Sequence, residues 1–143
     1  ELSKETIDDV AKACPPTWSW GNPVDIIGDA DTARYANVLT AVGKAPEVKG
    51  IIVIAARQAA TNIYEIAKWI GITHKISGKP TVACFAGIYD QESEQFLDTR
   101  GIPLVDTPER AITSLHALSV RGAFLRKKGI AIKRPPPEDP DGP

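Results

Sequence analysis

The sequence predicts an α/β fold, in which an open parallel sheet of about four to five strands carries helices on both faces. Residues 48–56 (VKGIIVIAA) and 79–87 (KPTVACFAG) are continuous apolar runs, typical of buried parallel strands. Amphipathic segments alternate with these runs, which indicates βαβ units with right-handed crossovers. We therefore expect the carboxyl ends of several strands to meet at one edge of the sheet.

The N-terminal part predicts two capped helices joined by a short strand. Ser3 precedes a helical pattern over residues 4–13, which Pro15 ends. The stretch NPVDIIGDAD, residues 22–31, predicts a strand over Val24–Ile27 and a turn at Gly28. Asp29 or Asp31 can then cap the following helix, whose apolar stripe runs through residues 35, 38, 39 and 42.

The remaining elements follow in alternation. Asn62 and Glu65 have capping-box spacing at the start of an apolar stripe over 61–76, and Gly101 ends a short helix over 90–101. Residues 102–106 (IPLVD) predict a third strand, and Thr107-Pro108 begins the last helix. We assign residues 1–128 to one domain and the Pro-rich, charged residues 129–143 to a linker or tail.

Composition excludes several functional classes. With 17 basic and 18 acidic residues, the net charge of −1 gives no field for nucleic acid or an anionic membrane. No apolar run approaches the roughly 20 residues that a membrane span needs. Cys14 and Cys84 fit a reducing compartment, so we expect a cytoplasmic protein with inert thiols. The chain begins at Glu1 and has no methionine, which suggests a segment of a longer protein.

Candidate binding residues follow the predicted strands, because parallel sheets bind ligands beyond the carboxyl ends of their strands. Three segments qualify, and they are Gly28–Ala30, Arg57–Thr61 and Gly87–Tyr89. In the middle segment, small residues open a helix whose amides and dipole favour an anion, and Arg57, Thr61 and Asn62 could add donors. From the residues alone, a capped helix after a strand, with a solvated Arg57, is the preferred interpretation of this segment.

Other candidate residues carry weaker signals. Asp25 and Asp29 lack a third ligand for a metal, so we expect no metal site and prefer a capping role for Asp29. His74 follows a helix end, and His116 is expected to be half-buried packing; neither has a nucleophile nearby. Trp18 and Trp20 suit a loop anchor or an interface. Neither GxGxxG nor GxxxxGK[ST] occurs, which argues against an independent nucleotide-binding enzyme.

Four blocks, in order, resemble the NDP-forming acyl-CoA synthetases. They are NPVDIIGDADTARYANVL (22–39), VKGIIVIAARQAATNIYEIAKWI (48–70), GKPTVACFAG (78–87) and GIPLVDTPERAITSLHAL (101–118). Over about residues 3–126 the chain is similar to the flavodoxin-like ligase domain that follows the phosphohistidine domain. It is similar also to the carboxyl-terminal domain of the succinyl-CoA synthetase β subunit.

The resemblance implies a reaction in which an acid, CoA and ATP give acyl-CoA, ADP and phosphate. It implies no catalytic side chain and no bound cofactor here; ATP or ADP, Mg²⁺ and CoA belong to the whole enzyme. The partners would be CoA-binding, phosphohistidine and ATP-grasp domains or subunits, so the isolated chain would be inactive. The helix amino-terminus offered to the phosphohistidine corresponds to Gln58, Ala59, Ala60, Thr61 and Asn62.

The sequence also departs from that family. Arg57-Gln58-Ala59-Ala60 stands where succinyl-CoA synthetases have a Gly-Gly pair and where acyl-CoA synthetases tend to place Pro at Arg57. Arg57, Gly28, Asp29 and Gly87 are therefore only candidate substrate or anion contacts. Two alternatives remain: a binding module for a small anion or CoA ester, and a subunit-contact scaffold that uses the Trp18/Trp20 loop and the last helix.

Overall fold

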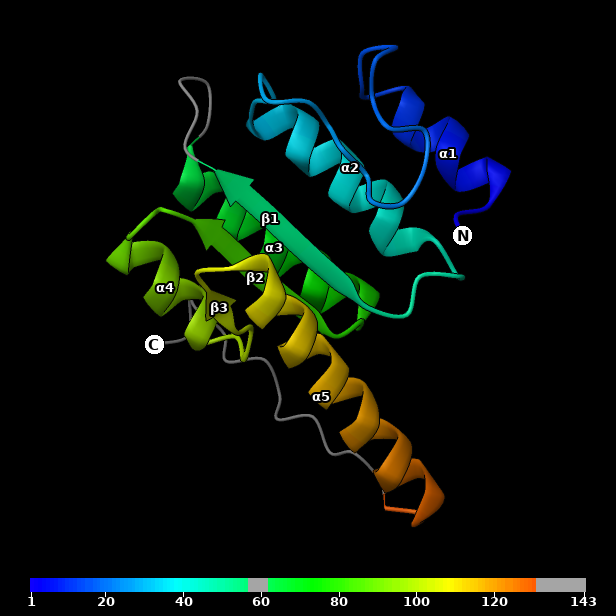
Figure 1. Ribbon diagram of the computed structural model, residues 1–143, viewed down its shortest axis with the longest axis vertical. Helices are drawn as coiled ribbons and strands as arrows, with labels where there is room; N and C mark the ends of the chain where they lie inside the picture. The colour runs from blue at the N-terminus through cyan, green and yellow to red at the C-terminus, as the bar shows by residue number, and fades with distance from the viewer. Residues whose placement is uncertain (57–61, 131–143) are drawn as a thin grey trace.

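The computed structural model describes residues 1–56 and 62–130, which contain a three-stranded parallel sheet and five helices (Figure 1). The strand order is β1-β2-β3. This confirms the α/β class, although the described residues hold fewer strands than the four to five expected. The elements in chain order are α1 (Lys4–Ala11), α2 (Thr32–Lys44), β1 (Ile51–Ala56), α3 (Ile63–Ser77), β2 (Thr81–Ala86), α4 (Gln91–Asp98), β3 (Leu104–Val105) and α5 (Pro108–Lys127).

Helices cover both faces of the sheet, as expected. β1 pairs with β2 from Ile51↔Thr81 to Ala56↔Ala86, and β2 pairs with β3 at its middle. Because side chains alternate along a strand, the two faces have different neighbours. Helices α2, α3 and α4 pack on one face, whereas α5 packs on the other against Val82 and Cys84.

The main core lies between the sheet and α3. The apolar stripe of α3 that the sequence predicts is buried, because it faces β1 and β2. Burying each large aliphatic side chain contributes about 1.5–3 kcal/mol, so this layer dominates the stability of the fold. The cluster consists of Leu39, Ile51, Val53, Ala55, Ile63, Ile66, Ala67, Ile70, Ala83, Phe85, Leu97 and Ile102.

The strand predicted over Val24–Ile27 is wrong, since this segment is irregular. Its backbone is bonded locally instead of to a sheet: Ser19 Oγ donates to the Pro23 carbonyl at 2.7 Å and accepts from the Asp25 amide at 2.9 Å. Val24 and Ile26 pack against a second cluster built around Val10, Trp18 and Val38. Apolar residues therefore mark burial in this segment without marking a strand.

The turn expected at Gly28 is confirmed, since the chain turns over Gly28 and Asp29, but the positive φ belongs to the preceding residue. Ile27 has φ 68°, in the left-handed region, and it immediately precedes Gly28. The Ile27 amide donates to Asp25 Oδ1 at 2.9 Å, and the Ile27 carbonyl accepts from the Ala30 amide at 3.1 Å. These two bonds hold the backbone of Ile27 in this conformation.

All five helices begin at a polar cap. In each case the cap's side chain accepts from the amide three residues on, at 2.8 to 3.3 Å. The caps are Ser3, Asp31, Asn62, Asp90 and Thr107. The end of α4 is equally local: Gly101 has φ 66°, and the Ile102 amide donates to the Leu97 carbonyl at 3.0 Å, as in a Schellman motif.

Lys79, in the connection between α3 and β2, closes the carboxyl end of α2. Its ammonium donates to the carbonyls of Val42, Gly43 and Ala45 at 3.2, 2.7 and 2.5 Å. A cation is favoured there because the last carbonyls of a helix carry partial negative charge. Burial nevertheless lowers the pKa of Lys79 from its usual value. This contact fixes α2 against the start of β2.

Glu47 ties the first helix to the connection between α2 and β1. Its Oε1 accepts from the Ser3 amide and from the Thr6 hydroxyl, both at 2.8 Å. Hydrogen bonds from the Ser3 amide, from its own amide and from Thr6 lower the pKa of Glu47 to about 2. The ionised carboxylate is therefore the form that holds α1 in place.

No helix among residues 1–56 and 62–130 is long and apolar enough to cross a membrane. α5 ends at Lys127, close to the predicted domain boundary at 128. Residues 131–143 lie outside the described part of the chain, so their assignment as a linker or tail stays a prediction.

Replacing Ile70 with Ala should lower the free energy of unfolding by about 2–5 kcal/mol, because Ile70 is fully buried in the main cluster. Ile76→Ala on the same helix is the control, since Ile76 is 78% exposed and should change stability by less than about 0.5 kcal/mol. Urea unfolding measures both. Equal losses would show that the two faces of α3 are not buried as described.

Stability should fall as the pH drops from about 4.5 toward 2, because Glu47 has a lower pKa in the folded chain than the ordinary 4.5. Protonation then favours the unfolded state. Glu47→Gln should be less stable than the parent at pH 6, and its stability should depend less steeply on pH in this window. Thermal unfolding between pH 2 and 6 tests this, and parallel curves for the two proteins would contradict it.

Candidate functional site

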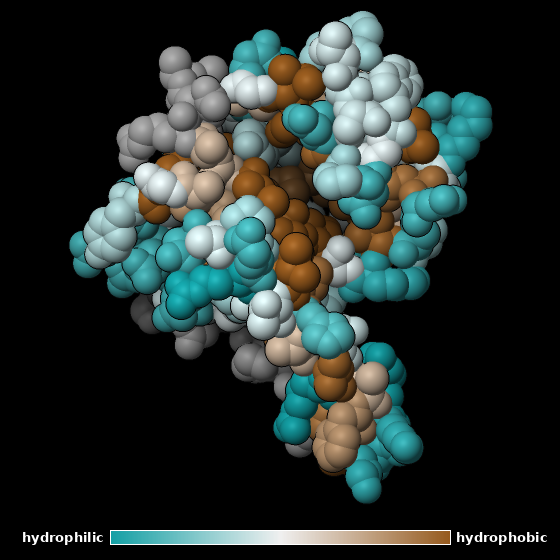
Figure 2. Space-filling model, viewed as in Figure 1, coloured by the Kyte–Doolittle hydropathy of each residue, from teal (hydrophilic) through white to brown (hydrophobic). Residues whose placement is uncertain are grey.

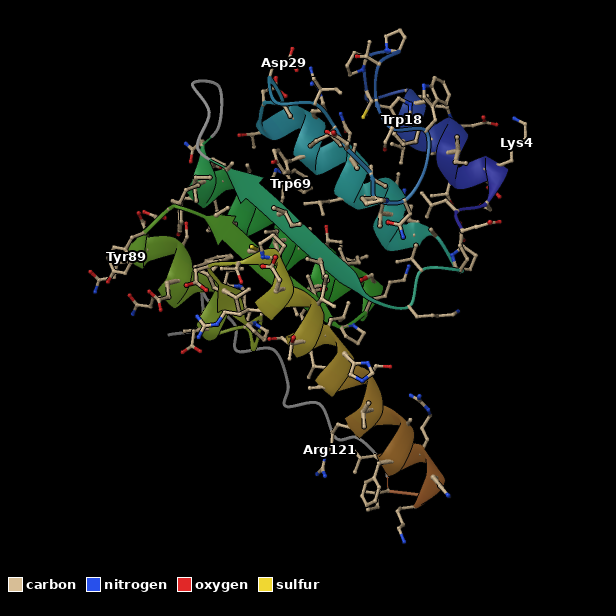
Figure 3. All side chains as sticks on the ribbon, viewed as in Figure 1. Lys4, Trp18, Asp29, Trp69, Tyr89 and Arg121 are labelled. Carbon is tan, nitrogen blue, oxygen red and sulfur yellow. The ribbon has the colours of Figure 1, made fainter. Side chains whose placement is uncertain are left out.

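The carboxyl ends of the strands meet at one edge of the sheet, as the parallel register requires. In Figure 1 the arrows of β1 and β2 point to the same end of the domain, and α2 and α3 both begin there. Figure 3 places Asp29 and Tyr89 at this end, well apart from each other. The predicted segments that contain Gly28 and Gly87 therefore both lie at the expected edge of the sheet, at separate places.

The central predicted segment lies mostly outside the described residues. Arg57, Gln58, Ala59, Ala60 and Thr61 are not described, so their roles stay predictions. The described part begins with the cap of α3.

The start of α3 is well defined. Asn62 Oδ1 accepts from the Glu65 amide at 3.1 Å, and the helix then runs for 15 residues from Ile63, two positions after the expected start at Thr61. The Glu65 carboxylate pairs with Lys68 at 2.5 Å. Asn62 is neutral, and Lys68 balances the charge of Glu65. The three side chains therefore add no net negative charge at the positive end of the helix dipole.

Asp31, rather than Asp29, caps α2, so the preference for Asp29 is wrong. Asp31 Oδ1 accepts from the Arg34 amide at 2.8 Å. Asp29 instead pairs with the Arg34 guanidinium at 2.5 Å, and the same guanidinium nitrogen donates to the Ile26 carbonyl at 2.9 Å. Asp29 therefore braces the Gly28 turn against α2. An anion at this turn would have to compete with Asp29 for Arg34.

Gly87 has a conformational role. It has φ 67° in the turn after β2, where the Ile88 amide donates to the Phe85 carbonyl at 3.4 Å. A side chain is disfavoured at that φ, which explains the glycine. The turn leaves Tyr89 81% exposed at the carboxyl edge.

A pocket of about 620 Å³ lies beside this turn, between the starts of α4 and α5. Its apolar lining includes Phe85 and Leu104, whereas its rim is charged. Arg110 pairs with Asp106 at 2.8 Å, and this hydrogen bond lowers the pKa of Asp106. The complete lining is Phe85, Ile88, Tyr89, Asp90, Glu94, Leu104, Val105, Asp106, Arg110, Thr113 and Ser114.

Sequence analysis missed this pocket. Its volume falls within the range of small-molecule sites. The local signal was present, because Asp90 and Thr107 are recognisable helix caps that follow two strands. The starts of α4 and α5 come together because β2 pairs with β3, and this pairing could not be predicted from the sequence.

The cysteine and histidine candidates differ in burial and in the contacts that they make. Cys84 is buried in the sheet, and burial raises the pKa of its thiol. His74 Nδ1 lies 3.0 Å from the Lys79 carbonyl oxygen. His116 is exposed, so the expectation that it would be half-buried is wrong. No group of three metal-ligating side chains occurs in the described ranges, 1–56 and 62–130.

The two tryptophans lie in the loop after α1 and differ in exposure. Trp18 is buried in the cluster between α1 and α2, and Trp20 is 52% exposed. Their ring centroids are 5.2 Å apart, and Trp20 Nε1 donates to the Pro16 carbonyl at 2.9 Å. Trp18 therefore anchors the loop, while Trp20 covers it.

The capping assignment can be tested by two alanine substitutions. Asp31→Ala should cost about 1 kcal/mol of unfolding free energy, since it removes the acceptor of the Arg34 amide. Asp29→Ala should cost less than about 0.5 kcal/mol, because the Asp29 carboxylate in the pair with Arg34 is exposed to water. Chemical denaturation compares them, and a larger loss for Asp29→Ala would reverse the assignment.

Comparison with known proteins identifies the relatives of this chain, although no family model matches it. It is 36% identical over 111 residues to the "Acetate--CoA ligase [ADP-forming] I subunit alpha" of Pyrococcus furiosus, covering 76% of this chain and 24% of that protein. It is 33% identical over 116 residues to the "4-hydroxybutyrate--CoA ligase [ADP-forming]" of Nitrosopumilus maritimus, covering 80% and 16%.

The fold has the same relatives. The "dinucleotide forming Acetyl-coenzyme A synthetase 1" of Ca. Korarchaeum cryptofilum superposes with a TM-score of 0.78 at 30% identity, over 92% of this chain and 30% of that one. A second structure of that protein, in complex with phosphate and ADP, gives 0.77. The chain thus spans between 16% and 27% of the curated relatives it matches. Sequence and fold together show that it corresponds to one part of the ADP-forming acyl-CoA synthetases.

Proposed function

We propose that this chain is the domain of an ADP-forming acyl-CoA synthetase that supports phosphoryl transfer without a catalytic side chain of its own. The reaction of the whole enzyme is acid, CoA and ATP to acyl-CoA, ADP and phosphate. The observation that carries the proposal is the agreement of two comparisons, since the relatives by sequence are named ADP-forming CoA ligases and the relative by fold is named an acetyl-coenzyme A synthetase. Acetate is the acid in the names of most of these relatives.

The chemistry assigned to this chain is electrostatic. A phosphoryl group between a histidine and a nucleotide needs its negative charge stabilised, and a helix amino-terminus provides amides and a positive dipole end. Helix α3 begins at the carboxyl edge of the sheet behind a neutral cap, Asn62. In this proposal Gln58, Ala59, Ala60 and Thr61 complete the site, and Arg57 lies next to it.

Other parts of the enzyme would supply the remaining groups. The proposal places CoA, Mg²⁺ and the ATP or ADP site on CoA-binding, phosphohistidine and ATP-grasp domains or subunits. The solved relative in complex with phosphate and ADP supports a nucleotide in the whole enzyme. The alternative is a non-catalytic module that binds a small anion or CoA ester at the same edge, for which Arg57 in place of the family's usual residue is the support.

A charge substitution at the cap separates a phosphoryl-stabilising role from a structural one. Asn62→Asp keeps a residue that caps helices equally well, so the thermal midpoint should be nearly unchanged. The new carboxylate repels phosphate, so kcat for ATP formation from acetyl-CoA, ADP and phosphate should fall about tenfold or more, equivalent to at least about 1.4 kcal/mol in the barrier. The assay uses the native polypeptide that carries this chain.

The control is Gln95→Glu, which makes the same change of charge on the exposed surface of α4, outside the pocket. It should leave kcat unchanged. A normal rate for Asn62→Asp would exclude a phosphoryl group at this helix end. If the parent polypeptide forms no ATP from acyl-CoA, the result would instead favour the non-catalytic binding module.

A further inference from the structure

The outer edge of β1 is open in the described part of the chain. β1 pairs with β2 on one side only, at the end of the strand order. All six of its residues, Ile51–Ala56, are uncharged and none is proline. Natural edge strands are usually protected by lysine, proline, a bulge or a covering element, because a bare edge pairs with other chains. β1 contains neither lysine nor proline.

The backbone of β1 offers a regular set of hydrogen-bonding groups at this edge. The Ile51 amide donates to the Pro80 carbonyl at 2.9 Å, on the side of β2. Alternate residues of a parallel strand point their N–H and C=O groups to the same neighbour, so Ile51, Val53 and Ala55 face β2. Ile52 and Ile54 consequently direct theirs outward.

One contact with this edge is present among the described residues: Tyr35 Oη of α2 lies 3.5 Å from the Ile54 carbonyl oxygen. This distance is at the outer limit of a hydrogen bond, so the contact is weak. α2 therefore borders the edge without replacing a strand.

The side chains at this edge are also incompletely covered. Ile52 packs in the cluster beneath α5, whereas Ile54, two residues on and on the same face, is 50% exposed. Figure 2 shows hydrophobic residues gathered in a hollow over β1, between α2 and α5. In a parallel sheet both faces of a strand are normally covered by helices. On this face the described helices leave the outer part of β1 uncovered.

From this edge and this face we propose that a strand–helix segment from the remainder of the synthetase completes the sheet: its strand pairs with β1, and its helix lies beside α5 over Ile54. The outward N–H and C=O groups of Ile52 and Ile54 select a strand, since a helix has no free backbone groups to offer them. A parallel strand is the expected orientation, because the existing pairs are parallel.

The source of the segment follows from two observations. The tail 131–143 contains five prolines, which lack the N–H that a ladder needs, so it is unsuited to this edge. The related structure of Ca. Korarchaeum cryptofilum carries this fold in a chain of which it makes up only 30%, so such proteins have ample chain to supply a strand. The inference rests on the proposed membership of a longer synthetase, but its test does not depend on enzyme activity.

Hydrogen exchange on the native polypeptide that carries this chain tests the pairing directly. If a strand covers β1, the amides of Ile52 and Ile54 should exchange within about tenfold of those of Val53 and Ala55, because all four are then bonded in the sheet. Fast exchange at Ile52 and Ile54 beside slow exchange at Val53 and Ala55 would overturn the proposal. Protection that disappears on dilution to monomer would also overturn it, since it would show pairing with a second copy.

A matched pair of substitutions tests the helix over Ile54. Ile54→Lys should lower the thermal midpoint of the native polypeptide by several degrees and raise exchange at Ile52 at least tenfold, because it buries a charge under the added helix. Ile76→Lys, at a position that is 78% exposed on α3, should change neither. Equal and negligible effects of both substitutions would show that Ile54 faces water in the native protein.

Discussion

The pairing of β1 with β2 is the constraint on which the rest of the domain depends. Its register, from Ile51↔Thr81 to Ala56↔Ala86, fixes which side chains enter the main core and which face α5. A slip of one residue would exchange the two faces of β1 and bring Ile52 and Ile54 into the core in place of Ile51 and Val53. The same register brings the carboxyl ends of the strands to one edge, so core and site are set together.

Local sequence signals predicted most of this fold. The caps Ser3, Asn62 and Thr107 and the apolar stripe of α3 act over three or four residues, a range that a single sequence reveals. The runs that form β1 and β2 were equally clear, because strands buried on both faces are apolar throughout.

The failures occurred where a backbone or side-chain group has several possible partners and the folded chain selects one of them. Val24 and Ile26 have the composition of a strand, but Ser19 satisfies the neighbouring backbone and Trp18 supplies an apolar partner. The choice between Asp29 and Asp31 depended on where Arg34 points. For the candidate site, the sequence located the edge of the sheet and the cap of α3, whereas the pocket beside α4 depends on the pairing of β2 with β3.

The connection between α3 and β2 has little freedom to change length, because Lys79 lies within it. Only residues 78–80 separate α3 from β2, and within them Lys79 must reach three carbonyls at the end of α2. An inserted or deleted residue here would change the direction of Lys79 and break a contact between elements more than 30 positions apart. Length variation among related proteins should therefore collect in the loops at the carboxyl edge, because an insertion there leaves the contacts of Lys79 with the end of α2 in place.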